Sequence, residues 1–281
     1  MSETIKRTHK FHSEAKVLEG DLRLPLVQRI HPQAHAQLAE EGGYRAQHAT
    51  GYRLEGVVSY SAAHSQVAGQ PGVKPGHGWC TLTTTVLENL NILEVLTADR
   101  IVGQIITEHP LEGYVPHIHF LGTRFDNLRI AGHRVELELD TNILGDKPAD
   151  DAPYTKDEGV VGRVSSQYER IRKHKSLPAE LAERYNRLAS TLKNPEAVEC
   201  SLVNQAAGPY PGHSFGHVIT IPGFGTITLG KLVVTHEDYD KKTGIPKKTT
   251  VQLTMVDLKL GCAIQGEMMM AVHVSNGTSW P

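Results

Sequence analysis

The chain has 281 residues, of which 39% are hydrophobic and 21% charged, and its formal net charge is −2. A chain of this length buries on the order of 70–75% of its unfolded surface, which is enough for one large β-domain or for two smaller domains. The nearly balanced charge argues against a global electrostatic attraction to nucleic acid or to an anionic membrane.

The three cysteines, Cys80, Cys200 and Cys262, lie far apart and show no C-x-x-C spacing. This pattern argues against a disulfide framework and against a cysteine-rich zinc site. Residues 1–17 contain no apolar stretch typical of a secretory signal, and the apolar run 268–272 is far too short to span a membrane. We therefore expect a cytoplasmic protein with reduced thiols and no membrane partner.

The first third of the chain gives mostly strand and loop signals. Residues 1–20 are polar and charged, and we expect them to form a flexible N-terminal segment, or an edge strand, ahead of a single β-rich domain over 21–281. A short helix is predicted over 31–41, because the two glycines at 42–43 would end it. Strands are predicted at 52–60 and at the Thr-rich segment 81–86.

The most regular strand pattern covers residues 133–140. Val135, Leu137 and Leu139 alternate with charged residues. A period of two predicts a strand with one buried face and one solvated face.

A helical insertion is predicted over 164–194. Ser166 and Glu169 have the spacing of a capping box, and Ser176 stands where an N-cap residue would precede Pro178. One apolar stripe has spacings of three or four residues, and it consists of Leu177, Leu181, Tyr185, Leu188 and Leu192. Such a stripe is typical of a helix that covers a sheet.

After residue 198 the chain again favours strands, at 199–204, 217–221, 226–235, 249–260 and 267–274. The apolar residues change phase between Met255 and Val256, which predicts a β-bulge at that point. The many strands and few helices predict a mainly β fold, an antiparallel β-sandwich or a barrel-like set of sheets with the helical insertion.

The strongest chemical signal is the pair His117 and His119. In a strand, residues i and i+2 point to the same face, about 6.6 Å apart along the strand, so two imidazoles could bind one metal ion. A complete site for zinc, iron or copper needs further ligands, for which His109 and His133 are the candidates. The alternative is two hydrogen-bonded histidines on a half-buried strand.

A second motif lies at residues 212–216, Gly-His-Ser-Phe-Gly. It resembles the nucleophile elbow of the α/β-hydrolases, and the resemblance implies Ser214 as nucleophile with Asp257 and His273 as acid and base. The residues that follow are β-branched and end in Pro222-Gly223, and they favour a turn entering a strand instead of the helix that the elbow requires.

Three classes of function remain open. The first is a non-catalytic binding or self-assembling protein, because long edge strands favour homo-oligomers. The second is a metal-dependent enzyme or metal-binding protein centred on His117 and His119. The third is a serine hydrolase that uses Ser214. Nucleic-acid binding is not expected, because the basic clusters are short and aromatic residues make up only 6% of the chain.

Overall fold

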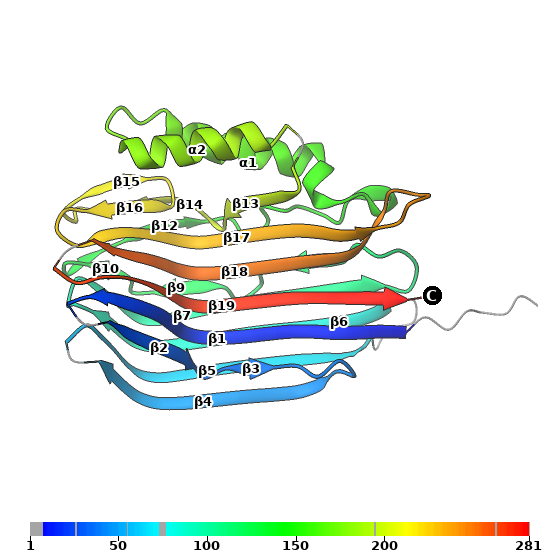
Figure 1. The fold of residues 1–281 in the computed structure, drawn as a ribbon, viewed down its shortest axis with the longest axis horizontal. Helices are drawn as coiled ribbons and strands as arrows, with labels where there is room; N and C mark the ends of the chain where they lie inside the picture. The colour runs from blue at the N-terminus through cyan, green and yellow to red at the C-terminus, as the bar shows by residue number, and fades with distance from the viewer. Residues whose placement is uncertain are drawn as a thin grey trace, which may run out of the picture.

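The computed structural model describes residues 8–25, 27–54, 56–72, 77–193, 195–261 and 263–280. Long antiparallel strands form two large sheets, and two α-helices lie along the β15–β16 side of the molecule (Figure 1). The predicted class, a mainly β, sandwich-like fold with a helical insertion, is confirmed. Among the described residues, no helix is long and apolar enough to cross a membrane.

The nine-stranded sheet, called sheet A, has the order β15-β16-β17-β18-β19-β1-β2, with β13 beside β17 and β3 beside β1. Its strands are β1 (Thr8–Leu24), β2 (Gln28–Gln33), β3 (Ala36–Gln37), β13 (Ala197–Ser201), β15 (His213–Phe215), β16 (Val218–Ile221), β17 (Gly225–Tyr239), β18 (Pro246–Gly261) and β19 (Gln265–Trp280). The N-terminal strand β1 therefore pairs with the C-terminal strand β19.

The eight-stranded sheet, called sheet B, has the order β11-β10-β7-β6-β5-β4, and the short strands β8 and β9 also pair with β7. Its strands are β4 (Gly43–Leu54), β5 (Val58–Pro71), β6 (His77–Ile92), β7 (Leu96–Pro110), β8 (His117–His119), β9 (Arg124–Asp126), β10 (Arg129–Ile130) and β11 (His133–Arg134). Strands β12 (Glu136–Leu139) and β14 (Val203–Ala207) form a separate pair.

The insertion contains the 3-10 turns η1 (Ala149–Asp151) and η2 (Tyr154–Lys156), followed by helices α1 (Glu158–Arg172) and α2 (Ala179–Thr191). Helix α1 begins six residues before the predicted insertion, because Asp157, not Ser166, is its N-cap and accepts a hydrogen bond from the Val160 N–H at 2.8 Å. The Ser166 hydroxyl donates within the helix to the Gly162 carbonyl.

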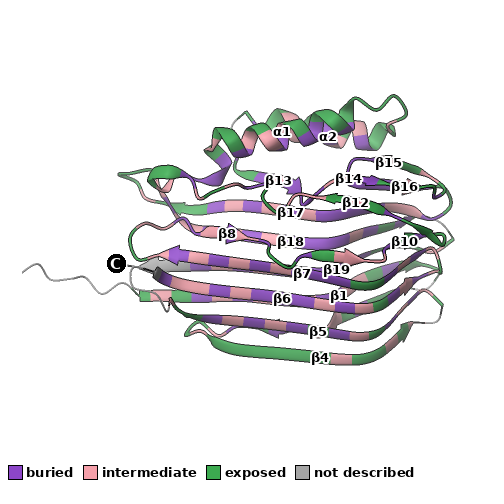
Figure 2. Ribbon diagram, turned by 180° about the vertical axis from the view of Figure 1, so that it is seen from behind, coloured by how far each residue is buried: buried purple, intermediate pink, exposed green. Residues whose placement is uncertain are grey.

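Alternate residues of the long strands enter the space between the two sheets, as the burial stripes of Figure 2 show. Part of this interior is polar. Buried hydroxyl and imidazole groups join the sheets there, and we call them the polar belt: Ser13, Thr83, Thr85, Thr107, His273 and Ser275. None of them belongs to either of the two apolar clusters of the interior.

The polar belt explains why the prediction of a flexible segment over 1–20 is wrong for residues 8–20. These residues form most of β1, which lies between β19 and β2 in sheet A. Phe11, Ser13, Ala15 and Val17 all face the interior and are at most 4% exposed. A small serine at an inward position hides the alternation that would have predicted a central strand. Residues 1–7 lie outside the described part.

One further prediction was wrong, and another was confirmed only in part. Residues 31–41 contain β2 and β3, with Ala34 between them at a positive φ, and not a helix. The regular pattern over 133–140 is divided between β11 in sheet B and β12 in the small sheet, and Val135 lies at the break. Alternation predicted the strands but could not predict that their partners change.

The change of phase in β18 is confirmed, but the β-bulge predicted to cause it is absent from the pairing of β18 with its neighbours. Met255 and Val256 are both fully buried, so the inward-facing positions shift by one residue between them. On the flanking strands, Gly230 and Ala271 have positive φ values of 59° and 52° at the same level, whereas the pairing register before and after this level is unchanged. The change of phase therefore runs across several strands of sheet A.

Candidate functional site

His117 and His119 lie on β8, at the β7 edge of sheet B. The intervening Ile118 is 3% exposed and faces the interior, so both histidines point outward. Their ring centroids are 4.0 Å apart. The expectation that the two imidazoles share a face is confirmed.

The surroundings of this pair favour the neutral form of His117. Burial lowers the pKa of His117 and the neighbouring His119 acts in the same direction, whereas Glu108, its partner in register, and Asp146 act against them. A neutral imidazole is the form that binds a metal. However, the described residues contain no group of three or more His, Cys, Asp or Glu side chains that could hold a metal ion.

The two remaining histidines of the predicted metal site lie elsewhere. His109 follows Glu108 on β7 but points into the interior, where it is 3% exposed and its ring lies 4.6 Å from that of His9. His133 is exposed on β11 and pairs with Ile130, which pairs with Leu96 at the opposite end of β7. About twelve residues at 3.3 Å each, roughly 40 Å, separate that end from Glu108. The predicted four-histidine site therefore does not form.

The predicted serine-hydrolase triad does not form either. Ser214 lies in the β15–β16 hairpin and its hydroxyl bonds to that of Tyr210. Asp257 pairs with Lys231 at 3.2 Å on the outer face of sheet A, whereas His273 is buried between the sheets against Thr85. The motif residues 213–215 form β15 itself, which turns at Gly216 into β16, so the strand-to-helix elbow of the hydrolases is missing.

A pair of histidines that sequence reasoning missed lies on the outer face of sheet B. His48 on β4 and His64 on β5 are direct cross-strand partners. Their Nδ1 atoms are 2.8 Å apart and their ring centroids 4.1 Å apart. The two residues are sixteen positions apart, and only the hairpin register of β4 and β5 brings them together. The sequence could have indicated this pair only through recognition of the β4–β5 hairpin.

A surface cavity of about 310 Å³ lies beside this pair. Its lining comes from three neighbouring strands and consists of Tyr44, Ala46, Gln47, His48, His64, Ser65, Gln66, Thr84 and Val86. No Asp, Glu, Lys or Arg contributes to it. The cavity is therefore suited to neutral groups and to the imidazole chemistry of its two histidines.

The neutral character extends across sheet B from β4 to β7. Three rows of residues in register on its outer face contain no charged side chain other than histidine: Tyr44, Ala68, Leu82 and Ile106; Ala46, Gln66, Thr84 and Gln104; His48, His64, Val86 and Val102. We call these three rows the neutral face. Tyr44 within it is 60% exposed.

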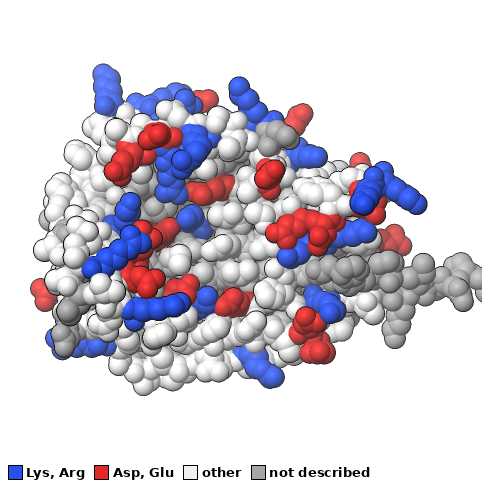
Figure 3. Space-filling model, in the orientation of Figure 1, with Lys and Arg blue, Asp and Glu red and all other residues white. Residues whose placement is uncertain are grey.

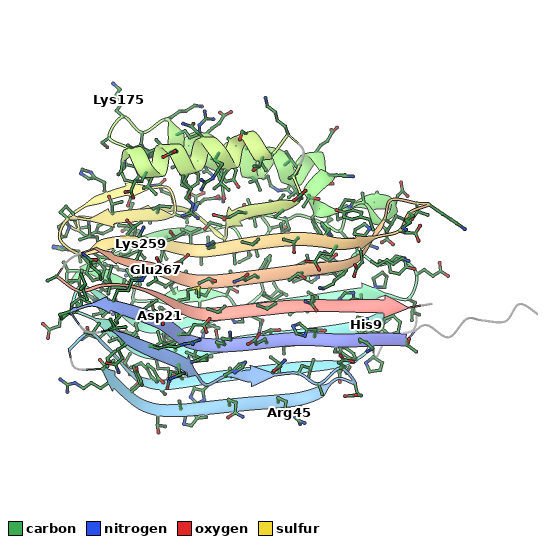
Figure 4. All side chains as sticks on the ribbon, in the orientation of Figure 1. His9, Asp21, Arg45, Lys175, Lys259 and Glu267 are labelled. Atoms are coloured by element: carbon green, nitrogen blue, oxygen red, sulfur yellow. The ribbon has the colours of Figure 1, made fainter. Side chains whose placement is uncertain are left out.

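The outer face of sheet A has a different character. Acidic and basic side chains are interspersed over it (Figure 3). Lys259, Glu267 and Asp21 lie in one row across β18, β19 and β1, and Figure 4 labels all three. Such a face is well solvated, so the neutral face of sheet B is the better candidate for a contact surface.

Strand β4 forms the open edge beside the neutral face. It lies at the end of sheet B, and nearly its whole length is exposed (Figure 2). Strand β4 pairs with β5 along one of its two sides. Every second residue of such a strand directs its N–H and C=O groups away from the sheet, where they can bind another strand.

The comparisons with known proteins identify a family without a described activity. No curated protein matches the sequence. A family described as "Domain of unknown function (DUF8256)" matches residues 9–235, which include nearly all of β1, the strands β2 to β16, both helices and most of β17. The match covers most of the chain, and the chain therefore belongs to the DUF8256 family.

Proposed function

We propose that this chain is a non-catalytic assembly module, and that it binds a second copy of itself along β4. The observation that carries the proposal is the open edge of β4, twelve residues long and exposed at most of its positions. Between Gly43 and the kink at Gly51, where φ is 59°, the strand offers a regular edge of about 26 Å at 3.3 Å per residue.

The composition of β4 supports pairing with another strand. Natural edge strands are commonly protected by proline, lysine, inward-pointing charges or short length. The segment 43–54 contains no proline, lysine, aspartate or glutamate, and Arg45 and Arg53 are its charged residues. Arg45 is labelled at this edge in Figure 4.

The other described edges of the two sheets are short. Sheet A ends at β15, of three residues, and at β2 and β3, of six and two residues. On its other side, sheet B ends in β8, β9 and β11, of two or three residues each. Only short contacts could form there, which leaves β4 as the favoured edge.

A second copy is the favoured occupant because an antiparallel strand edge is complementary to itself. A two-fold axis perpendicular to the sheet places the same edge on both partners and continues sheet B from one chain into the other. The same axis places the two neutral faces side by side on one surface. We further propose a cytoplasmic location, which agrees with the free thiols of Cys80 and Cys200.

The proposal is tested by measuring the molar mass in solution over a wide range of concentration, for wild type and for Ala46→Pro and Gln47→Pro. Successive N–H groups of an edge strand point alternately toward its neighbour and away from it. One of the two prolines therefore removes an outward N–H and should abolish the dimer without loss of thermal stability. The other should disturb the β4–β5 pairing and lower the melting temperature.

The control is Glu183→Lys, a change at an exposed position of α2, far from β4, that should leave the dimer intact. A proline at this position would break α2 and would not serve as a control. A wild-type protein that stays monomeric at all concentrations refutes the proposal. A dimer that survives both prolines also refutes it, since its interface would then lie elsewhere.

A further inference from the structure

The structure points to a transition-metal site at His48 and His64, which goes beyond the proposed assembly and can stand or fail without it. We propose that the two imidazoles chelate one divalent ion of the Ni²⁺, Cu²⁺ and Zn²⁺ class through their Nδ1 atoms. The site lies on the outer face of the β4–β5 hairpin.

The distance between the donor atoms fits such a chelate. The two Nδ1 atoms are 2.8 Å apart. With metal–nitrogen bonds of about 2.0–2.1 Å, two imidazole nitrogens lie about 2.9 Å apart at a right angle and about 3.4 Å apart in a tetrahedral site. The observed separation is closest to two adjacent positions of a tetragonal or octahedral ion, the geometry of Cu²⁺ and Ni²⁺.

The chemistry of the pair also favours a cation. Two neutral imidazoles that face each other through Nδ1 can share one proton only if one ring has its N–H at Nδ1. If both rings have their N–H at Nε2, two lone pairs oppose each other. A metal ion between the rings satisfies both lone pairs and displaces the single shared proton.

The scaffold holds the pair in place. His48 and His64 are opposite each other in register within the β4–β5 ladder, so their Cβ atoms are held about 4.5–5.5 Å apart. Both side chains are exposed, which gives a metal ion direct access from solvent. The neutral cavity beside them leaves room for water or for a donor atom from another molecule in the remaining coordination positions.

The pair His117 and His119 provides a matched comparison on the same sheet. Its rings are equally close, at 4.0 Å between centroids, but both side chains are half-buried. The positions lie on one strand, two residues apart, and not across a strand pair. Metal binding at the two pairs can therefore be compared. The comparison distinguishes a cross-strand chelate from a general affinity of metal ions for neighbouring histidines.

The test is a calorimetric titration of the full-length, tag-free and metal-free chain with Ni²⁺. Wild type should bind one ion per chain at this site. His48→Ala and His64→Ala should each weaken the affinity at least tenfold, and the double variant should lose little more, because a chelate fails when either donor is removed. The double variant His117→Ala/His119→Ala should keep the wild-type affinity within about twofold.

Cu²⁺ paramagnetic resonance supplies a second measurement, in which wild type should show two coordinated imidazoles and either single variant should not. Thermal melting should show that the exposed alanine substitutions leave the fold intact. Unchanged Ni²⁺ affinity in His48→Ala and His64→Ala overturns the proposal, as does an affinity that follows His117 and His119. The same titration on the β4 proline variant that is monomeric and keeps its melting temperature should give the wild-type affinity, because the metal site needs only the β4–β5 hairpin of one chain.

Discussion

His273 on β19 and Thr85 on β6 join the two sheets through a hydrogen bond of 2.9 Å between imidazole Nε2 and hydroxyl Oγ1. Both side chains are fully buried. The His273 ring lies directly over Gly103 of β7, where a Cβ atom would overlap it. The residue types at these three positions are therefore linked. The Thr85 hydroxyl bonds the His273 imidazole, and a glycine at position 103 leaves room for the ring.

Replacement of Thr85 by valine should destabilise the fold by about 1–3 kcal/mol, because the shape is kept while the buried His273 nitrogen loses its partner. Urea denaturation followed by fluorescence measures the change in the free energy of unfolding. Thr226→Val, at a half-buried position of β17, is the control and should cost much less. Equal losses in the two variants would contradict the importance of the polar belt.

Gly103→Ala should also destabilise the protein, by about 1–3 kcal/mol, since the added methyl group must displace the His273 ring or the neighbouring Met255 side chain. Gly261→Ala tests the effect of the same change at a strand position with no described atom within 4 Å, and it should be neutral or slightly stabilising. The melting temperatures of the two variants distinguish a steric clash in the interior from the general effect of replacing a strand glycine by alanine. If Gly103→Ala keeps the wild-type melting temperature, the side chains around position 103 must be able to shift and make room for the methyl group.

Acid should unfold the protein through its buried histidines. Burial lowers the pKa of His273 and of His236 to about 4, and that of His109 and of His217 to about 3. The His236 Nε2 atom accepts the Tyr154 N–H at 3.0 Å, an interaction that protonation would break. These four residues are kept neutral by the fold.

The sign of the pH dependence follows from these shifts. Above the unfolded pKa of about 6.5 both states are neutral and stability is complete. As pH falls toward 4, only the unfolded state takes up protons, so each such histidine costs about 1.4 kcal/mol per pH unit, and the loss levels off below the folded pKa. Denaturation at pH values from 8 to 4 measures this slope. His217→Gln should reduce the slope below pH 6.5, whereas replacement of the exposed His133 by glutamine should leave it unchanged.

The attachment of the helices depends on Gln167 of α1. Its amide donates to the Ser201 carbonyl at 2.8 Å and accepts from the Ser201 N–H at 3.0 Å, as a neighbouring strand would. Gln167→Met keeps the volume but leaves the Ser201 backbone unpaired, at a cost of about 1–3 kcal/mol for each group. Limited proteolysis should then cut within the exposed linker 173–176 faster than in wild type. Glu169→Met, on the exposed side of the same helix, is the control, and equal cleavage of both variants would contradict the assigned role.

Local patterns predicted a large part of this fold. The β-branched segments after residue 198, the apolar stripe of α2 and the change of phase at Met255 all appear in the structure. The same reasoning failed where an inward position is occupied by a polar residue. Ser13 within β1 and Thr83 and Thr85 of β6 face the interior, and each bonds there to a group of the opposite sheet.

The candidate sites show the same division. The shared face of His117 and His119 follows from the period of a strand, and it could be predicted from the sequence. The failure of His109 and His133 to join them could not, because strand partners and the inward or outward phase of β7 decide where those side chains lie. The meeting of His48 with His64 likewise required the β4–β5 register.

The sequence by itself determined the secondary-structure class, the two helices and the residue pairs that lie within one strand, since these depend on contacts between near neighbours in the chain. Only the tertiary structure decided which strand is left with an open edge, which face is neutral and which histidines meet across strands. The physical reason is that hydrogen bonds between strands form between backbone groups that every residue carries. The pairing of strands that are far apart in the sequence is therefore selected by the packing of the whole sandwich.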